Sequence, residues 1–316
     1  MIPVAIFGTV GTPSGPHRAP RHPLKATVHL LVFALLAGVA CTVCAAEVLA
    51  VMPDVREPYR SILQQIADGI RQTADTRLEL LPAGSALAIG NERVLIALGS
   101  AAVEASAPLA SRLPVVTGAI VSPAGQPPLP GISLEPDPEA LFAQLLKLRP
   151  GVRRVHWIYR PERSDWLLEH AQAAARKLRI GLVAHAADDA RTASQTYQDI
   201  LRTADNTTEA VWLGQDPALI STDANLPDIL NLAWSNNVIV FSGSLQHVAN
   251  GVLFALFPDN TAMGADLARL ALAFVSGKTA GFVPNRALRR AVNRRTAEHL
   301  GLSLDAQQFD LVLPAH

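Results

Sequence analysis

Residues suited to holding a small molecule follow most of the apolar runs in this sequence. When short apolar runs form a parallel sheet, the loops after their carboxyl ends feed helix N-termini, which present free N–H groups and a positive dipole end. Loops of this kind bind carboxylates and phosphates, so the pattern predicts a ligand site. The predicted contact residues are Asp54, Tyr59, Gly99, Ser100, Thr117, Gly118, Tyr159, Arg160, Gln215, Asp216, Ser242, Ser244 and Asp259.

Some of these residues have a second interpretation. Arg160 could supply a bidentate partner for an anionic ligand, or it could form a surface salt bridge. Ser100 could contact the ligand or cap the helix that it opens, and Asp216, which precedes Pro217, is interpreted first as a cap. Tyr159 could offer a stacking surface or could belong to the core at a strand end.

No motif in the sequence has the spacing that catalysis requires. The nucleophile elbow G-x-S-x-G and the zinc motif H-E-x-x-H are both absent, and His156, His185 and His247 lack metal-ligand spacing. Gly277 and Lys278 match only the end of a phosphate loop, and they follow a helix, so Gly277 is predicted to be a helix C-cap. The sequence therefore predicts a protein that is not an enzyme and needs no metal or cofactor, with an extracytoplasmic enzyme as the remote alternative.

The charge balance argues against nucleic-acid binding. Among 316 residues, Lys and Arg total 27, and Asp and Glu also total 27, so the formal net charge is zero. One basic cluster stands out, and without interleaved aromatic residues it is predicted to be a solvated face and not a nucleic-acid footprint. Its members are Arg286, Arg289, Arg290, Arg294 and Arg295.

The first 46 residues have the order of a secretory signal. Basic residues precede an apolar stretch at 28–40, and small residues end at Ala46. The stretch is shorter than the roughly 20 residues of a permanent membrane span. We expect cleavage after Ala46 and export to the periplasm. A retained anchor, or a lipoprotein acylated at Cys41, is the alternative.

Beyond the leader, short apolar runs alternate with amphipathic segments. Strands are predicted at 48–52, 94–98, 114–118, 155–159, 181–185, 210–213, 238–241 and 252–257. Helices are predicted around Ile62 to Ile70 and near 163–178, 192–204, 218–234 and 260–276. Fully apolar strands that alternate with helices are typical of parallel sheets covered on both faces.

A Pro-rich segment divides this alternation. It runs from 123 to 130 and is predicted to be a hinge or linker. Two strand–helix series on either side of such a segment predict an α/β protein with two doubly wound parallel-sheet lobes, a hinge and an interlobe cleft.

The order of the landmarks resembles the substrate-binding proteins of ABC transporters, of the periplasmic-binding-protein type I kind. The branch that it resembles most includes lipoproteins that bind tryptophan or other aromatic amino acids. Each motif is weak alone, and their order and spacing carry the resemblance. The motifs are VLIALGS at 94–100, LPVV at 113–116, LRPGVRRV at 148–155, YRP at 159–161, GVLFA at 251–255, SGK at 276–278 and VNRRTAEHLGL at 292–302.

The resemblance implies a two-lobed trap with three crossings between its lobes. The first lobe would comprise 47–122 and 259–280, and the second 131–258 and 281–316. The family's usual Asp-Pro is Ser122-Pro123 here, and its Tyr-Asn-Pro contains Arg160, so the ligand's identity is not implied.

The predicted partners are a small amino-acid-like or anionic ligand and an ABC permease in the inner membrane, with the protein itself a monomer. The alternative is the same fold acting as a sensor, or as a partner module for a membrane receptor.

Overall fold

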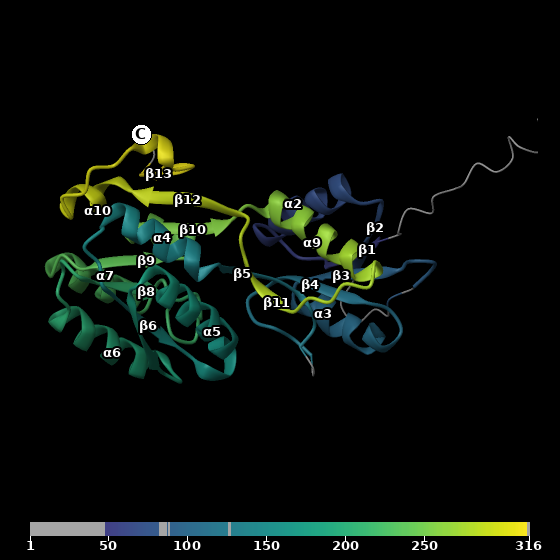
Figure 1. Ribbon diagram of the computed structural model, residues 1–316, viewed down its shortest axis with the longest axis horizontal. Coiled ribbons are helices and arrows are strands. Elements are labelled where there is room, and N and C mark those ends of the chain that lie inside the picture. Colours follow the sequence, from purple (N-terminus) through teal and green to yellow (C-terminus); the bar gives the residue numbers. More distant parts are fainter. Residues whose placement is uncertain (1–47, 82–86, 88, 126–127, 315–316) are drawn as a thin grey trace, which may run out of the picture. The chain divides into compact units, whose positions relative to one another are not determined.

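The computed structural model describes residues 48–81, 87, 89–125 and 128–314. The predicted leader, its cleavage site after Ala46 and Cys41 lie outside the described residues. Within the described ranges the chain forms two sheets, with helices on both faces of each sheet (Figure 1). The predicted α/β architecture with two doubly wound lobes is confirmed.

The first lobe is built on a sheet in the order β11-β5-β4-β3-β1-β2. Every residue of β3 is buried, because its side chains point alternately into a core on each face. The strands are β1 Val48–Pro53, β2 Thr76–Leu81, β3 Val94–Leu98, β4 Val115–Ile120, β5 Gly131–Pro136 and β11 Phe282–Asn285. The helices are α2 Tyr59–Thr73, α3 Ser100–Ser106, the 3-10 turn η1 Ala107–Ser111 and α9 Asn260–Val275.

The second lobe is built on a sheet in the order β13-β12-β10-β9-β8-β6-β7. The strands are β6 Arg154–Tyr159, β7 Gly181–Ala186, β8 Glu209–Leu213, β9 Ile239–Ser242, β10 Phe254–Pro258, β12 Leu288–Asn293 and β13 Leu311–Leu313. The helices are α4 Pro138–Leu148, α5 Pro161–Leu178, α6 Ala190–Thr203, α7 Leu226–Ser235, α8 Leu245–Ala249, α10 Arg294–His299 and the 3-10 turn η2 Ala306–Gln308.

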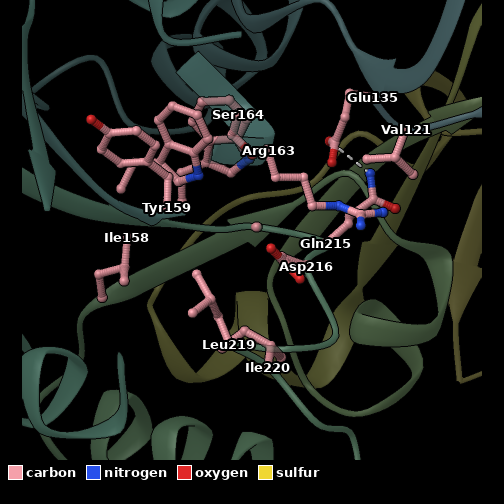
Figure 2. A pocket seen from close by; sticks show the side chains of 13 residues that line it. Val121, Glu135, Ile158, Tyr159, Arg163, Ser164, Gln215, Asp216, Leu219 and Ile220 are labelled. Carbon is pink, nitrogen blue, oxygen red and sulfur yellow. Dashed lines mark hydrogen bonds between the residues drawn. The ribbon is translucent and has the colours of Figure 1, made fainter. Parts of the chain in front are cut away.

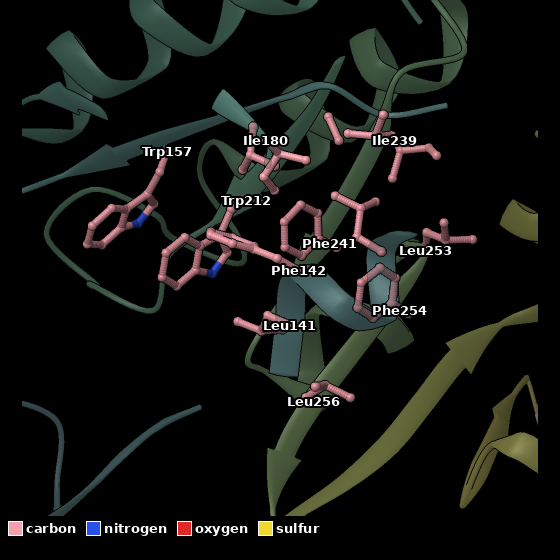
Figure 3. Close-up of a cluster of buried hydrophobic side chains, with 14 of the residues drawn as sticks. Leu141, Phe142, Trp157, Ile180, Trp212, Ile239, Phe241, Leu253, Phe254 and Leu256 are labelled. Carbon is pink, nitrogen blue, oxygen red and sulfur yellow. The ribbon is translucent and has the colours of Figure 1, made fainter. Parts of the chain in front are cut away.

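Aromatic packing fixes one core of the second lobe (Figure 3). Phe142 of α4 stands edge-on to Trp212 of β8, with ring centroids 5.7 Å apart. Trp212 in turn stacks on Trp157 of β6 at 4.4 Å. Offset and edge-on pairs of this kind add about 1 kcal/mol each to the free energy of area burial. They hold β6 and β8, whose carboxyl ends face the first lobe, in a fixed register.

Within the described residues the chain passes between the sheets three times, as the resemblance implies. The crossings follow β5, β10 and β11, and backbone hydrogen bonds join them side by side. The N–H of Asp137 donates to the carbonyl of Asn285 at 2.8 Å, and that of Asp259 donates to the carbonyl of Ala287 at 2.9 Å. Arg286 Nε also donates to Asp137 Oδ2 at 2.8 Å.

Several predicted boundaries were wrong. Strand β5 pairs with β4, and β11 pairs with β5, so both belong to the first sheet and not to the second lobe. The segment 123–130 therefore joins two strands of one sheet, and the links between the lobes are the three crossings instead.

Other elements also differ from the sequence prediction. The half-exposed strand β2 was not predicted, and the helix predicted at 218–234 begins only at Leu226, after a series of turns. Strand β12 runs antiparallel to β10. Gly277 does follow the end of α9 with a φ of 80°, as a C-cap requires, and the predicted C-cap is confirmed.

Helices α2 and α9 lie side by side on one face of the first sheet (Figure 1). Glycines permit this approach: a Cβ added at Gly264 would lie 2.0 Å from the Ile66 carbonyl oxygen, and one at Gly69 would lie 1.9 Å from that of Thr261. The close contact fixes the position of both helix N-termini.

Replacing Gly264 with Ala should therefore lower the free energy of unfolding by about 3 kcal/mol, because the backbones must separate to admit one methyl group. Urea unfolding of the purified protein measures this loss. Gly281→Ala is the matched control, because a Cβ there meets no atom within 4 Å. An equal effect of the two substitutions would contradict the packing argument.

Candidate interlobe ligand site

A cavity of about 1000 Å³ lies between the two lobes, and we call it the interlobe cleft. Its volume is at the upper end of the range for small-molecule sites. Its walls are largely apolar, and its polar groups come from α2, from the start of α3, from the loops after β8 and β9, from α8, from the start of α9 and from β12. The apolar lining residues are Pro53, Val55, Ile62, Leu63, Ala101, Ala119, Leu134, Leu245, Phe257 and Pro258.

Part of the predicted contact set lines this cleft. These residues are Tyr59, Gly99, Ser100, Gln215, Ser244 and Asp259. Tyr59, the first residue of α2, is 68% exposed at the cleft. Ser100 is the first residue of α3, and Gly99 occupies the N-cap position before it, so the cap interpretation of Ser100 is wrong.

Three predicted residues are enclosed within the lobes. Thr117 is fully buried and donates from Oγ1 to the carbonyl of Pro130 at 3.1 Å. Gly118 packs under α9, where an added Cβ would lie 2.5 Å from a methyl carbon of Leu267. Ser242 is buried and lies 2.8 Å from His247 Nδ1. These residues do not line the cleft, because their strand positions point into the cores.

The remaining predicted residues lie outside the cleft. Asp54 forms an exposed ion pair with Arg60. Arg160 Nε pairs with Asp216 Oδ2 at 3.0 Å, so the salt-bridge interpretation of Arg160 describes the structure. Asp216 also accepts from the N–H of Ala218 at 3.0 Å and thereby caps a turn.

Tyr159 stacks on another aromatic residue of the protein and does not line the interlobe cleft. Its ring lies 5.0 Å from that of Trp157, at an interplanar angle of 26°. Burial raises the pKa of its hydroxyl, and Asp165 adds to the rise.

Arg289 is a cleft residue that the sequence prediction did not select. It lies on β12 directly opposite Phe257, and its guanidinium carbon is 5.7 Å from the centre of that ring. Among the described residues it has no carboxylate partner. In the sequence Arg289 is one of five neighbouring arginines, and only the register with β10 distinguishes it.

Asp259 brings a negative charge to the same cleft. Its Oδ1 accepts from the N–H of Ala262 at 3.0 Å and caps α9. In the part of the chain that the structure describes, its carboxylate forms no ion pair, with Arg289 or with any other residue. The cleft thus offers one cationic and one anionic group that do not neutralise each other.

A small enclosed pocket adjoins the cleft at Gln215, which lines both (Figure 2). It has room for about one water molecule. Gln215 Nε2 donates to Glu135 Oε2 at 2.9 Å across the lobes. Burial raises the pKa of Glu135 to about 7, while the hydrogen bond from Gln215 and the charge of Arg163 act to lower it.

No group of three or more side chains among the described residues could hold a metal ion. Over the same ranges, no helix has the length and apolar character of a membrane span.

No protein-family model matches the sequence, and no curated protein matches it either. Solved structures do match. One is a conserved domain protein from Vibrio cholerae, with a TM-score of 0.53 and 19% identity, over 85% of this chain and 99% of that one. Another is an ABC domain in complex with L-Trp from Streptococcus pneumonia, with a TM-score of 0.54 and 17% identity, over 85% of this chain and 100% of that one.

A third is the ligand-free, open structure of a substrate binding protein with adhesive properties from Clostridium difficile. It has a TM-score of 0.58 and 11% identity, over 86% of this chain and 100% of that one. The chain has the periplasmic-binding-protein type I fold. This confirms at the level of the fold the resemblance found in the sequence.

Proposed function

We propose that this protein is an exported solute-binding protein that captures a small zwitterion, of the amino-acid kind, in its interlobe cleft. The observation that carries the proposal is the pair of charges without an ion-pair partner among the described residues, Arg289 and Asp259, in a largely apolar cleft between two lobes.

An amino acid complements this arrangement. Its α-carboxylate would receive hydrogen bonds from Arg289, and its α-ammonium would donate to Asp259. Hydrogen bonds to charged groups contribute about 1.5–3 kcal/mol each. The apolar walls would accept an apolar or aromatic side chain. The structural neighbour from Streptococcus pneumonia holds L-Trp, which supports this ligand class for the fold.

Closure of the lobes would complete the site. Hinge bending around a ligand is the usual motion of such two-lobed proteins. Tyr59 is positioned to cover a ligand, because it is exposed at the cleft in this structure. The bound solute would leave unchanged, since the cleft contains no nucleophile–base pair among its described lining residues.

The leader and the fold together support a role in the periplasm, where the protein would act as a monomer and deliver its solute to an ABC permease of the inner membrane. Cell fractionation tests the location, and the processed mass distinguishes cleavage after Ala46 from acylation at Cys41.

Calorimetry with a panel of L-amino acids tests the ligand class. One or a few members should bind with one molecule per chain. The N-acetyl and the amide derivatives of the best ligand should each bind at least about 10-fold more weakly, because each removes one charge. Equal binding of the charged and uncharged forms would overturn the proposal, as would binding of none of the amino acids.

A further inference from the structure

Gln215 lies between the interlobe cleft and the small pocket that contains Glu135, and it lines both. Its Nε2 points to Glu135, and its Oε1 has no hydrogen-bond partner among the described residues. The amide is closely packed: a Cβ added at Gly243 would lie 2.6 Å from Gln215 Nε2 and 2.7 Å from Pro136. The nitrogen end of the amide thus lies against Gly243 while it donates to Glu135.

Glu135 occupies the end of β5, just before the first crossing, and is 7% exposed. The charged groups that face it are Arg163 from α5 and Asp216 from the loop after β8, and Asp216 is itself paired with Arg160. Tyr159 of β6 lines the same pocket (Figure 2).

The protonation state of Glu135 decides how Gln215 can hydrogen-bond to it. An ionised carboxylate only accepts, so it requires the Gln215 NH₂ group and leaves the amide oxygen free. A protonated carboxyl can donate its O–H, so it can bind the amide oxygen and leave the NH₂ group free. No other titratable group is within hydrogen-bond distance of this amide in the described residues.

We propose that Glu135 is a positioning residue for the ligand site, which sets whether Gln215 presents an acceptor or a donor to the interlobe cleft. Proton uptake by Glu135 admits the reversed orientation of the Gln215 amide, in which the carboxyl O–H donates to the amide oxygen, and so changes the polar complementarity of the cleft. The consequence for the ligand depends on the proposed function, but the reversal itself is a property of the ligand-free protein.

Both states are accessible near neutral pH, because burial raises the pKa of Glu135 to about 7. A change of pH around neutrality would therefore change which hydrogen-bonding group Gln215 presents to a ligand in the cleft.

Proton NMR of the Gln215 side-chain amide in the ligand-free protein tests this inference. Its NH₂ shifts should titrate with a midpoint at pH about 7. The nuclear Overhauser contact between the NH₂ group and the Gly243 α-protons should be strong above the midpoint and clearly weaker below it. Loss of the signals in Gln215→Met assigns them. Gln246 lines the same cleft and has no carboxylate partner in the described residues, so its amide signals serve as an internal control.

In Glu135→Gln both the titration and the weakening of the contact should disappear. Constant Gln215 signals across the pH range, or a shift without weakening of the Gly243 contact, would overturn the inference, and the wild-type spectrum alone decides this if the variant does not fold. An identical titration in Glu135→Gln would overturn it too. Because no ligand is present, failure here leaves the proposed function standing, and failure of the amino-acid panel leaves this inference standing.

Discussion

Replacing Arg289 with Gln should weaken amino-acid binding by about 10- to 100-fold, because a charged hydrogen bond to the α-carboxylate is replaced by a neutral one. Binding of the amide derivative, which has no carboxylate, should change little. Comparing the two ligands distinguishes loss of carboxylate recognition from a general distortion of the cleft. Isothermal calorimetry of wild type and variant with both ligands measures the effect.

Arg290→Gln provides the matched control. Arg290 is next to Arg289 on β12, but it does not line the cleft, and its guanidinium lies 3.9 Å from Asp310. Affinity should be unchanged in this variant. An equal loss in both variants, or no loss in Arg289→Gln, would contradict the assignment of Arg289 to the ligand site.

Replacing Glu135 with Gln should stabilise the protein at pH 8 relative to wild type, and much less at pH 4.5. The folded pKa of Glu135 is raised from 4.5 to about 7, so the folded state holds a proton that the unfolded state releases between those values. Wild-type stability from this group is therefore fully present below pH 4.5 and is lost as the pH rises through 7. The shift corresponds to a loss on the order of 3 kcal/mol.

Urea unfolding of both proteins at several pH values measures the difference. The comparison with Glu135→Gln is needed because other buried groups act in the opposite direction. Burial lowers the pKa of His247 to about 4. The free energy of unfolding therefore decreases as the pH falls and His247 becomes protonated, in wild type and variant alike. A difference between the two proteins that does not vary with pH would contradict the assigned burial of an ionisable Glu135.

Most of the fold could be predicted from the sequence, because buried parallel strands are apolar throughout. The run at β3 is an example, with every side chain enclosed. Strand β2 escaped prediction because it lies at the sheet edge and alternates charged with apolar residues. The assignment of β5 to the second lobe failed because proline-rich composition marks a loop but does not say which sheet the next strand joins.

The site was predictable only in part, for reasons of side-chain direction and pairing. Loops after strands were correctly expected at the cleft, as Gly99 and Ser244 illustrate. Ser242 ends a strand, where the pleat turns its hydroxyl inward. Arg160 and Asp216 are 56 residues apart in the chain, and only the structure shows that they pair with each other. Arg289 could not be identified from the sequence, because its place in the cleft results from the antiparallel register of β12 with β10, which local sequence does not encode.

Native mass spectrometry tests the central claim most directly. The protein, freed of bound molecules and equilibrated with the amino-acid panel and with an extract of bacterial metabolites, should acquire one small adduct per chain. This adduct should be much less abundant on Arg289→Gln at the same ligand concentration, and the molecule recovered after denaturation should be chemically unchanged. A protein that remains without an adduct under all of these conditions would contradict the account, and so would recovery of a converted product.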